Sequence, residues 1–162
     1  MKKTNAMRIL DGAGIEYETR EYDDDGEHKL ERGAAGKTAE KIGADPSTVF
    51  KTIVMRTDSK EVVVFCQSAI HEINLKKARQ AAGAKEVSPV KENELLALTG
   101  YVRGGCSPLG MRKKYRTFID SSALEHDRIN ISAGVRGQQL CLSPKDLASV
   151  TDAEFVDLVL ED

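Results

Sequence analysis

Two adjacent apolar segments constrain the fold of this 162-residue chain more than any other feature. Residues 49–56 and 61–66 are rich in β-branched and aromatic residues, which favour strands. Asp58-Ser59-Lys60 between them is typical of a hairpin turn. Elsewhere, short predicted strands and helices follow one another without regular βαβ alternation. The pattern predicts an α+β fold in a single compact domain over residues 1–162, with a central mixed, largely antiparallel sheet flanked by helices.

Capping residues and glycines mark the other elements. The sequence predicts helices after Thr4 and Asn74, ending near Gly12 and Gly83, because Thr and Asn cap helix starts and Gly ends helices. Capping-box signatures at residues 143–146 and 151–154 predict two further helix starts, although residues 155–160 also fit a strand. The remaining predicted elements are helices at 34–42, 91–98 and 121–125 and strands at 15–22, 117–120, 129–132 and 139–142.

Charge and cysteine usage exclude several classes of protein. The net charge is −2 and aromatic residues make up 5% of the chain, so it lacks the basic excess and the stacking platform of a protein that grips long nucleic acid alone. An RNA ligand would then be contacted only at a short end, or be held with the help of a partner.

Three widely spaced cysteines form no C-x-x-C pair, which predicts no metal and no disulfide. With no signal peptide and no apolar run of membrane-spanning length, we expect a cytoplasmic protein that binds no membrane.

Lys51 is the first candidate functional residue. Alternate residues of a strand share a face, so Lys51 points the same way as Ile53 and Met55. A lysine on an apolar face is costly to bury unless it is paired, and otherwise it reaches out to water. Its ammonium would suit a phosphate or a developing oxyanion, and the residues alone leave a functional and a purely structural role equally open.

A glycine-rich loop at residues 104–110 is the second candidate, because glycine lets the backbone approach a ligand closely. A tight structural turn is the commoner explanation of such glycines, and the loop at residues 134–137 is a weaker example of the same kind. Cys106 and Ser107 invite a nucleophile hypothesis, but His28, His71 and His126 fall in no pattern that supplies a base. We therefore expect neither residue to act as a nucleophile.

These segments, in this order, resemble a known family. The resemblance rests on Val49-Phe50-Lys51-Thr52, on Ile73-Asn74-Leu75-Lys76-Lys77, on Gly100-Tyr101-x-x-Gly104-Gly105-x-Ser107-Pro108-Leu109-Gly110, on Phe118-Ile119-Asp120 and on Ser132-Ala133-Gly134-x-Arg136-Gly137. Together they look like the YbaK/EbsC family of Cys-tRNA(Pro) deacylases, which are relatives of the editing domain of bacterial prolyl-tRNA synthetases. The resemblance extends from Thr4 to about Asp157 and implies a barrel-like sheet.

The resemblance also implies a site between the lysine strand and the Gly-x-x-x-Pro loop. Lys51 matches the family's essential lysine, and the substrate-binding residues it implies are Tyr22, Gly104, Gly105, Cys106, Ser107, Pro108, Gly134, Arg136 and Gln139. The chain departs from the family at Ala34, near which an aromatic residue is common, and at Gln139, near which some members carry an acid. Both departures bear on pocket size and substrate selectivity.

The function implied is trans-editing of Cys-tRNA(Pro) without a cofactor, by attack of the substrate's own thiol on its ester. The implied partners are the tRNA(Pro) acceptor end and prolyl-tRNA synthetase. Two alternatives remain at this point: deacylation of another mischarged tRNA such as Ala-tRNA(Pro), and a non-catalytic module that binds tRNA ends or nucleotides. A lysine and a glycine loop would serve either.

Overall fold

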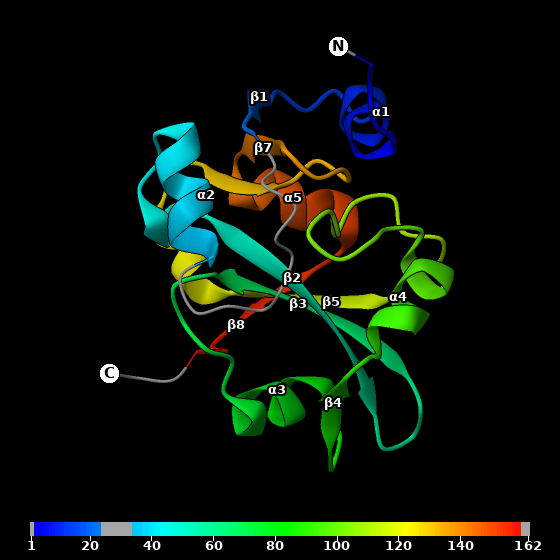
Figure 1. Ribbon diagram of the computed structural model, residues 1–162. Coiled ribbons are helices and arrows are strands. Elements are labelled where there is room, and N and C mark those ends of the chain that lie inside the picture. The colour runs from blue at the N-terminus through cyan, green and yellow to red at the C-terminus, as the bar shows by residue number, and fades with distance from the viewer. Residues whose placement is uncertain (1, 24–33, 160–162) are drawn as a thin grey trace.

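The computed structural model describes residues 2–23 and 34–159, which form an α+β fold with two sheets (Figure 1). A five-stranded sheet has the order β4-β2-β3-β5-β8, and a three-stranded sheet has the order β1-β7-β6. The strands are β1 (Glu18–Glu21), β2 (Phe50–Thr57), β3 (Val62–Ser68), β4 (Val87–Pro89), β5 (Arg116–Asp120), β6 (Ile129–Ser132), β7 (Gln138–Leu142) and β8 (Glu154–Val156). Only the β3–β5 and β5–β8 pairs are parallel among the described strands, so the predicted mixed, largely antiparallel arrangement is confirmed.

The predicted hairpin of apolar strands forms the centre of the larger sheet. β2 and β3 pair antiparallel from Phe50–Ser68 to Arg56–Val62, and every residue of β3 is buried. The turn closes with a hydrogen bond from the Thr57 amide to the Glu61 carbonyl at 2.8 Å. Within the sheet β3 is flanked by β2 and β5, and apolar clusters on both faces of the sheet bury its side chains.

Two helices, α1 and α3, begin and end where the sequence predicted. The Thr4 side chain accepts from the Met7 amide at the start of α1 (Asn5–Gly12), and Asn74 accepts from two amides of α3 (Leu75–Ala82). Gly83 ends α3 in a left-handed conformation, with φ of 69°. The other helices are α2 (Ala34–Ile42), α4 (Glu92–Thr99) and α5 (Pro144–Thr151), with single 3-10 turns at Pro46–Thr48 and Ser121–Glu125.

The C-terminal part of the chain differs from the prediction in two ways. Ser143 starts α5 as expected, but its hydroxyl makes no capping hydrogen bond. The second capping-box prediction, at residues 151–154, is wrong. Asp152 takes a left-handed conformation that ends α5, and Glu154 to Val156 then pair in parallel with β5. The short strand β4, at the edge of the sheet, was not predicted because it spans only Val87–Pro89.

Apolar side chains form two clusters on opposite faces of the larger sheet. On one face, Ala78 and Ala82 of α3 cover Met55, Phe65 and Phe118. On the other face, side chains from both sheets and from α1 and α5 share one core, which includes Val64, Cys66, Ile119, Ile131, Leu140, Leu142, Leu147 and Leu10. The two sheets therefore enclose a common core.

The described strands do not close into a barrel, so the barrel-like form is not confirmed. A single parallel bridge, between Val49 and Asn130, connects the two sheets where β2 meets β6. Among the residues that the structure describes, no helix is long and apolar enough to cross a membrane.

Candidate functional site

A row of polar side chains runs across four strands where the two sheets meet. Lys51 on β2 lies directly opposite Gln67 on β3, so the two side chains share a face. On the other side of β2, the Val49–Asn130 bridge is parallel, and Lys51 and Ser132 each lie two residues beyond it. Val49 and Lys51 share one face of β2, and Asn130 and Ser132 share one face of β6, so the bridge turns the Lys51 and Ser132 side chains toward the same side of the two sheets. 

The row continues onto the three-stranded sheet. Ser132 pairs with Gln139 on β7, so the order across the strands is Gln67, Lys51, Ser132 and Gln139. We call these four residues the polar row. Its two predicted members, Lys51 and Gln139, lie far apart in the sequence, and the contact of β2 with β6 brings them together.

Burial and a neighbouring charge shift the pKa of Lys51 in opposite directions. Partial burial lowers the pKa of the Lys51 ammonium below its ordinary value, and the negative charge of Glu72 raises it in part. Gln67 and Gln139 are both buried, and each carries a side-chain oxygen without a hydrogen-bond partner in the described structure. A cation with buried acceptors near it can bind an anionic or carbonyl oxygen, while the acceptors remain available to ligand donors.

The predicted glycine loop packs against the second predicted loop. Arg136 donates from Nε to the carbonyl oxygen of Arg103 at 2.9 Å. A Cβ atom placed on Gly105 would lie 3.2 Å from the amide nitrogen of Arg136 and 3.2 Å from the carbonyl carbon of Val135. Glycine at position 105 therefore allows the two loops to approach within van der Waals contact.

Tyr101 lies between these loops and holds both of them. Its buried ring would be 2.9 Å from a Cβ atom on Gly134, and its hydroxyl donates to the carbonyl of Leu109. Within the glycine loop, the hydroxyl of buried Ser107 accepts from the Leu109 amide at 3.2 Å, while Pro108 is buried and Gly104 is exposed. Ser107 thus stabilises the turn.

The thiol of Cys106 faces away from the polar row. It is close enough to Cys66 for the two to interact electrostatically, and Cys66 lies on the opposite face of β3 from Gln67. Burial raises the pKa of Cys106 to about 12, although a hydrogen bond with Thr99 lowers it in part. Burial likewise raises the pKa of Cys66 to about 12. Both thiols are therefore protonated near neutral pH, which is unsuited to nucleophilic attack.

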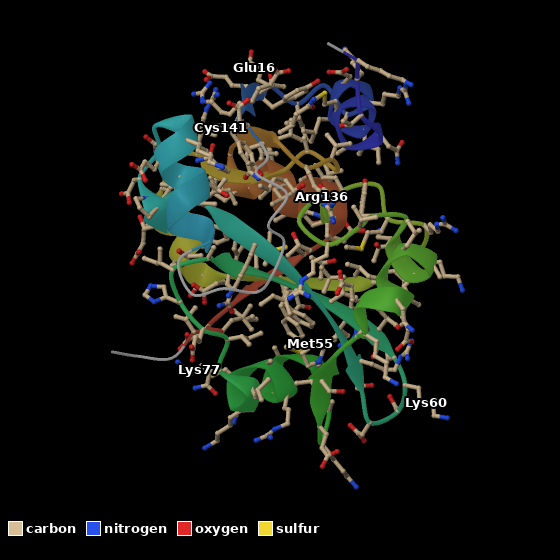
Figure 2. All side chains as sticks on the ribbon, in the orientation of Figure 1. Glu16, Met55, Lys60, Lys77, Arg136 and Cys141 are labelled. Carbon is tan, nitrogen blue, oxygen red and sulfur yellow. The ribbon has the colours of Figure 1, made fainter. Side chains whose placement is uncertain are left out.

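The loop at residues 133–137 connects the polar row with the glycine loop. It begins directly after Ser132, whose hydroxyl accepts from the Gly134 amide at 3.2 Å, and it continues to Arg136 beside the glycine loop (Figure 2). Tyr22 lies at the other end of this loop, where its amide donates to the carbonyl of Gly137 at 2.9 Å. The ammonium of Lys41 is 5.8 Å from the centre of the Tyr22 ring.

Sequence reasoning missed Gln67 and did not assign a role to Ser132. A usable signal exists for Ser132, since Ile129-Asn130-Ile131-Ser132 alternates apolar and polar residues and predicts one polar face. For Gln67 the signal is a polar residue, followed by Ser68, near the end of an otherwise apolar strand. His71 and His126, the two histidines that the structure describes, lie in the loop after β3 and near Asp45 respectively.

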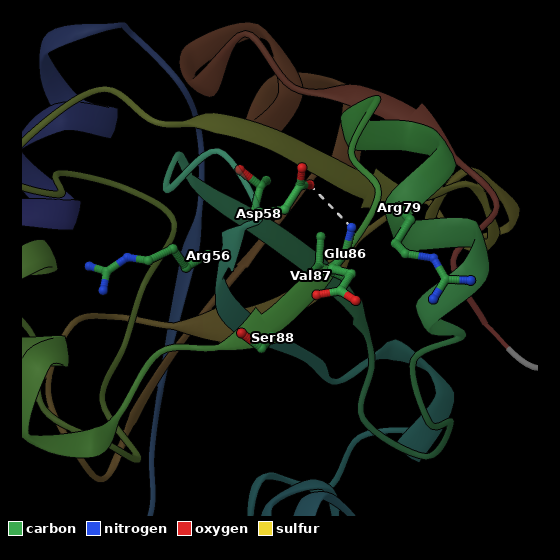
Figure 3. A pocket seen from close by; sticks show the side chains of 7 residues that line it. Arg56, Asp58, Arg79, Glu86, Val87 and Ser88 are labelled. Atoms are coloured by element: carbon green, nitrogen blue, oxygen red, sulfur yellow. Dashed lines mark hydrogen bonds between the residues drawn. The ribbon is translucent and has the colours of Figure 1, made fainter.

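A separate pocket of about 270 Å³ lies at the far end of β2, between β4 and α3 (Figure 3). Two of its charged side chains, those of Arg56 and Asp58, are engaged within the protein. Arg56 pairs with Glu94 at 2.7 Å, and Asp58 accepts from the amides of Lys85 and Glu86. Because these contacts already hold the strand and the turn together, the polar row and the two loops are the better candidate site.

Known structures include proteins with the same fold as this chain. The chain superimposes on the crystal structure of a protein provisionally assigned as a trans-editing enzyme for prolyl-tRNA synthetase, with a TM-score of 0.79 and 20% identity over 99% of this chain and 100% of that one. At this identity the likeness establishes the α+β editing fold.

Sequence comparison then identifies the family. Residues 32–150 match the model of the aminoacyl-tRNA editing domain. The chain is 34% identical over 161 residues to an Enterococcus faecalis protein provisionally named Cys-tRNA(Pro)/Cys-tRNA(Cys) deacylase EbsC, covering 99% of this chain and 96% of that protein. It is 32% identical over 95 residues to the proline–tRNA ligase of Campylobacter fetus, covering 57% of this chain and 16% of the ligase. The chain belongs to the aminoacyl-tRNA editing domain family, in agreement with the resemblance to YbaK/EbsC proteins, and this membership supports aminoacyl-tRNA deacylase activity.

Proposed function

We propose that this protein is a trans-editing deacylase that removes cysteine from mischarged Cys-tRNA(Pro). The proposal is supported by the similarity to EbsC along almost the full length of both chains, since that relative is provisionally named for this substrate. It is supported physically by the polar row, which combines the partly buried ammonium of Lys51 with the buried, unpartnered amide oxygens of Gln67 and Gln139. 

The state of the candidate nucleophiles is the observation that carries the mechanism. The Cys106 and Cys66 thiols are protonated because burial raises each pKa to about 12. The Ser107 hydroxyl is buried in its turn. An aminoacyl ester is already an activated bond, so a protein with this arrangement acts by holding the ester and stabilising charge rather than by attacking it.

In the proposed step the sulfur of the substrate's cysteine attacks its own carbonyl carbon. The thiol loses its proton, the new C–S bond forms, the C–O bond to the ribose breaks, and the ribose oxygen takes up a proton. The products are a cyclic thiolactone, which water then opens, and the free tRNA end. Alanine and serine esters lack the thiol, so this route distinguishes cysteine by chemistry where a small apolar pocket would distinguish it only weakly.

In this proposal Lys51 anchors the terminal phosphate or stabilises the negative charge that develops on the carbonyl oxygen. The glycine loop and the loop at residues 133–137 hold the aminoacyl carbonyl or the ribose, through backbone amides that close packing keeps in place. Positioning of this kind contributes several kcal/mol, about 7–11 at most. Tyr22 and Arg136 lie beside Gly137 at the C-terminal end of the second loop and would bound the substrate there.

The tRNA partner is proposed to be delivered by prolyl-tRNA synthetase. The net charge of −2 favours weak binding of tRNA by this chain alone. The similarity to segments of proline–tRNA ligases supports a role beside that enzyme. A complex in which the synthetase holds the tRNA body and passes the charged 3′ end would reconcile the two observations.

Deacylation of Cys-tRNA(Pro) and Ala-tRNA(Pro), measured side by side, tests this function. The wild type is compared with Lys51→Ala and with Lys145→Ala, a matched control at an exposed position of α5. We expect rapid loss of cysteine alone, at least about 100-fold slower in Lys51→Ala because an electrostatic contact to developing charge is removed, and unchanged in the control.

Other outcomes would change the assignment. Preference for alanine would keep the site but replace the thiol mechanism, because alanine cannot attack its own ester. Turnover of neither ester, even with prolyl-tRNA synthetase added, would indicate a binding module. Near-normal activity of a folded Lys51→Ala variant would contradict the role of the lysine.

A further inference from the structure

Gln67 is a buried polar residue that the mechanism above does not use. It is the penultimate residue of the strand β3, is fully buried, and lies directly opposite Lys51. Directly opposed residues in an antiparallel pair have Cβ atoms about 4.5–5.5 Å apart. Its Oε1 atom has no hydrogen-bond partner among the described residues, although buried acceptors are nearly always satisfied.

The orientation of the Gln67 amide is determined by its other end. Nε2 donates to the carbonyl oxygen of His71 at 2.9 Å. A carbonyl can only accept, so the amide cannot be turned over without losing this bond. Oε1 is therefore held as an acceptor within the polar row, where the Lys51 ammonium, with three donors, is its cross-strand neighbour.

The same hydrogen bond holds the loop that carries Glu72. Gln67 fixes His71 at one end of this loop, and the Asn74 amide fixes the other end by donating to the Leu158 carbonyl at 2.7 Å. Glu72 lies between these two points and acts electrostatically on Lys51. One side chain thus controls both an acceptor beside the ammonium and the position of its counter-charge.

We propose that Gln67 is a positioning residue for Lys51: the Gln67 Oε1 atom is the acceptor toward which the ammonium is held, with or without substrate, while Nε2 holds the Glu72 loop against it. The proposal rests on the function proposed for Lys51. It explains why a glutamine with an unpartnered oxygen occupies a fully buried position, and it makes the geometry of the lysine depend on β3 as well as β2. Gln67 itself need not touch the reacting atoms.

The charges around Lys51 determine whether a substitution at position 67 raises or lowers the pKa of Lys51. Glu72 is the charged group that acts on Lys51 among the described residues. The helix α3, which packs on the same face of the sheet, carries Lys76, Lys77 and Arg79, and Arg20 lies opposite Gln139 at the far end of the row. An acceptor and a carboxylate both favour the charged ammonium. Removing either therefore lowers the pKa of Lys51, and placing a carboxylate at position 67 raises it.

NMR titration of Lys51 tests the inference without any substrate. The protein is labelled with ¹³C-lysine, and the ε-carbon signal of Lys51 is assigned by its loss in Lys51→Arg. This signal is followed from neutral pH to pH 10.5, the ordinary pKa of a lysine side chain. We expect Gln67→Met, which removes the amide at similar length, to lower the titration midpoint by about one pH unit. Gln67→Glu should raise it. Gln138→Met is the matched control, since Gln138 also has an unpartnered Oε1 atom but lies on the opposite face of β7 from Gln139.

Deacylation kinetics then connect the position with activity. Because protonated Lys51 is the active form in this proposal, activity is present below its pKa and is lost as the pH rises through it. Gln67→Met should lower kcat/KM about 10-fold and move the alkaline limb of its pH profile to lower pH, and Gln67→Glu should move that limb to higher pH. The control should change neither.

The two readouts separate failure of this inference from failure of the proposed function. An unchanged Lys51 midpoint in folded Gln67→Met and Gln67→Glu proteins overturns the inference, whatever the activity. If Gln67→Met does not fold, the Gln67→Glu titration alone decides. Shifted midpoints in a protein that deacylates no aminoacyl-tRNA would support the positioning contact while refuting the proposed function.

Discussion

Substitution of Gly134 by alanine is expected to be unusually costly, because two independent effects act at this position. Gly134 has φ of 101°, a conformation that L-residues rarely adopt, and alanine in such a conformation costs about 1–2 kcal/mol. The added Cβ would also lie 2.9 Å from the Tyr101 ring. That ring cannot swing away, because it is buried and its hydroxyl is bonded to Leu109. Overpacking of this kind costs about 1–3 kcal/mol more.

Gly83→Ala is the matched control, since Gly83 also has a positive φ, 69°, but has no atom within 4 Å of an added Cβ. Urea unfolding should show a loss of about 1–2 kcal/mol for Gly83→Ala and about 2–5 kcal/mol for Gly134→Ala. Deacylation should also fall in Gly134→Ala, because displacing Tyr101 disturbs both loops. Equal destabilisation in the two variants would show that backbone strain alone acts at Gly134, and would refute the packing of Tyr101 between the loops.

Three further predictions concern the loops and the buried thiols. Cys106→Ala should keep deacylation within about two-fold, because the thiol faces Cys66 and is protonated; a dead enzyme would restore the nucleophile hypothesis. The pKa of each thiol is about 12 in the folded protein and 9.0 in the unfolded chain. The contribution of the thiols to the free energy of unfolding should therefore be constant below pH 9 and fall as the pH rises toward 12. Urea midpoints measured across this range should fall less in Cys106→Ala, which has one buried thiol fewer. Tyr101→Phe leaves the Leu109 carbonyl without its donor and should lower the free energy of unfolding by about 1–2 kcal/mol; no change would mean that this bond contributes nothing net.

Elements with strong local signals were predictable from the sequence. The β2–β3 hairpin, the Thr4 and Asn74 caps and the Gly83 stop all arise from residues within a few positions of one another, so the local chain largely determines them. The second capping signature failed because pairing of Glu154 to Val156 with β5 outweighed the local helix preference. β4 is too short to carry a pattern of its own.

The candidate site, like the fold, could be predicted from the sequence only in part. Lys51 and the two glycine loops could be singled out, since a lysine on an apolar face and clustered glycines are unusual in any context. Their mutual arrangement could not, because Lys51 and Ser132 are separated by 80 intervening residues. Which strand lies beside β2 depends on packing between the sheets, and a change of one residue in register would turn Ser132 to the other face.

The sequence by itself therefore determined the α+β class, the family, most helix boundaries and the residue types that could carry chemistry, because local propensity and motif spacing encode these. Only the tertiary structure decided that Gln67, Lys51, Ser132 and Gln139 form one polar row, and that Cys106 faces away from it. The physical reason is that strand order, register and burial arise from contacts distant in the chain, and these contacts determine which side chains share a face and whether a thiol or an ammonium keeps its charge.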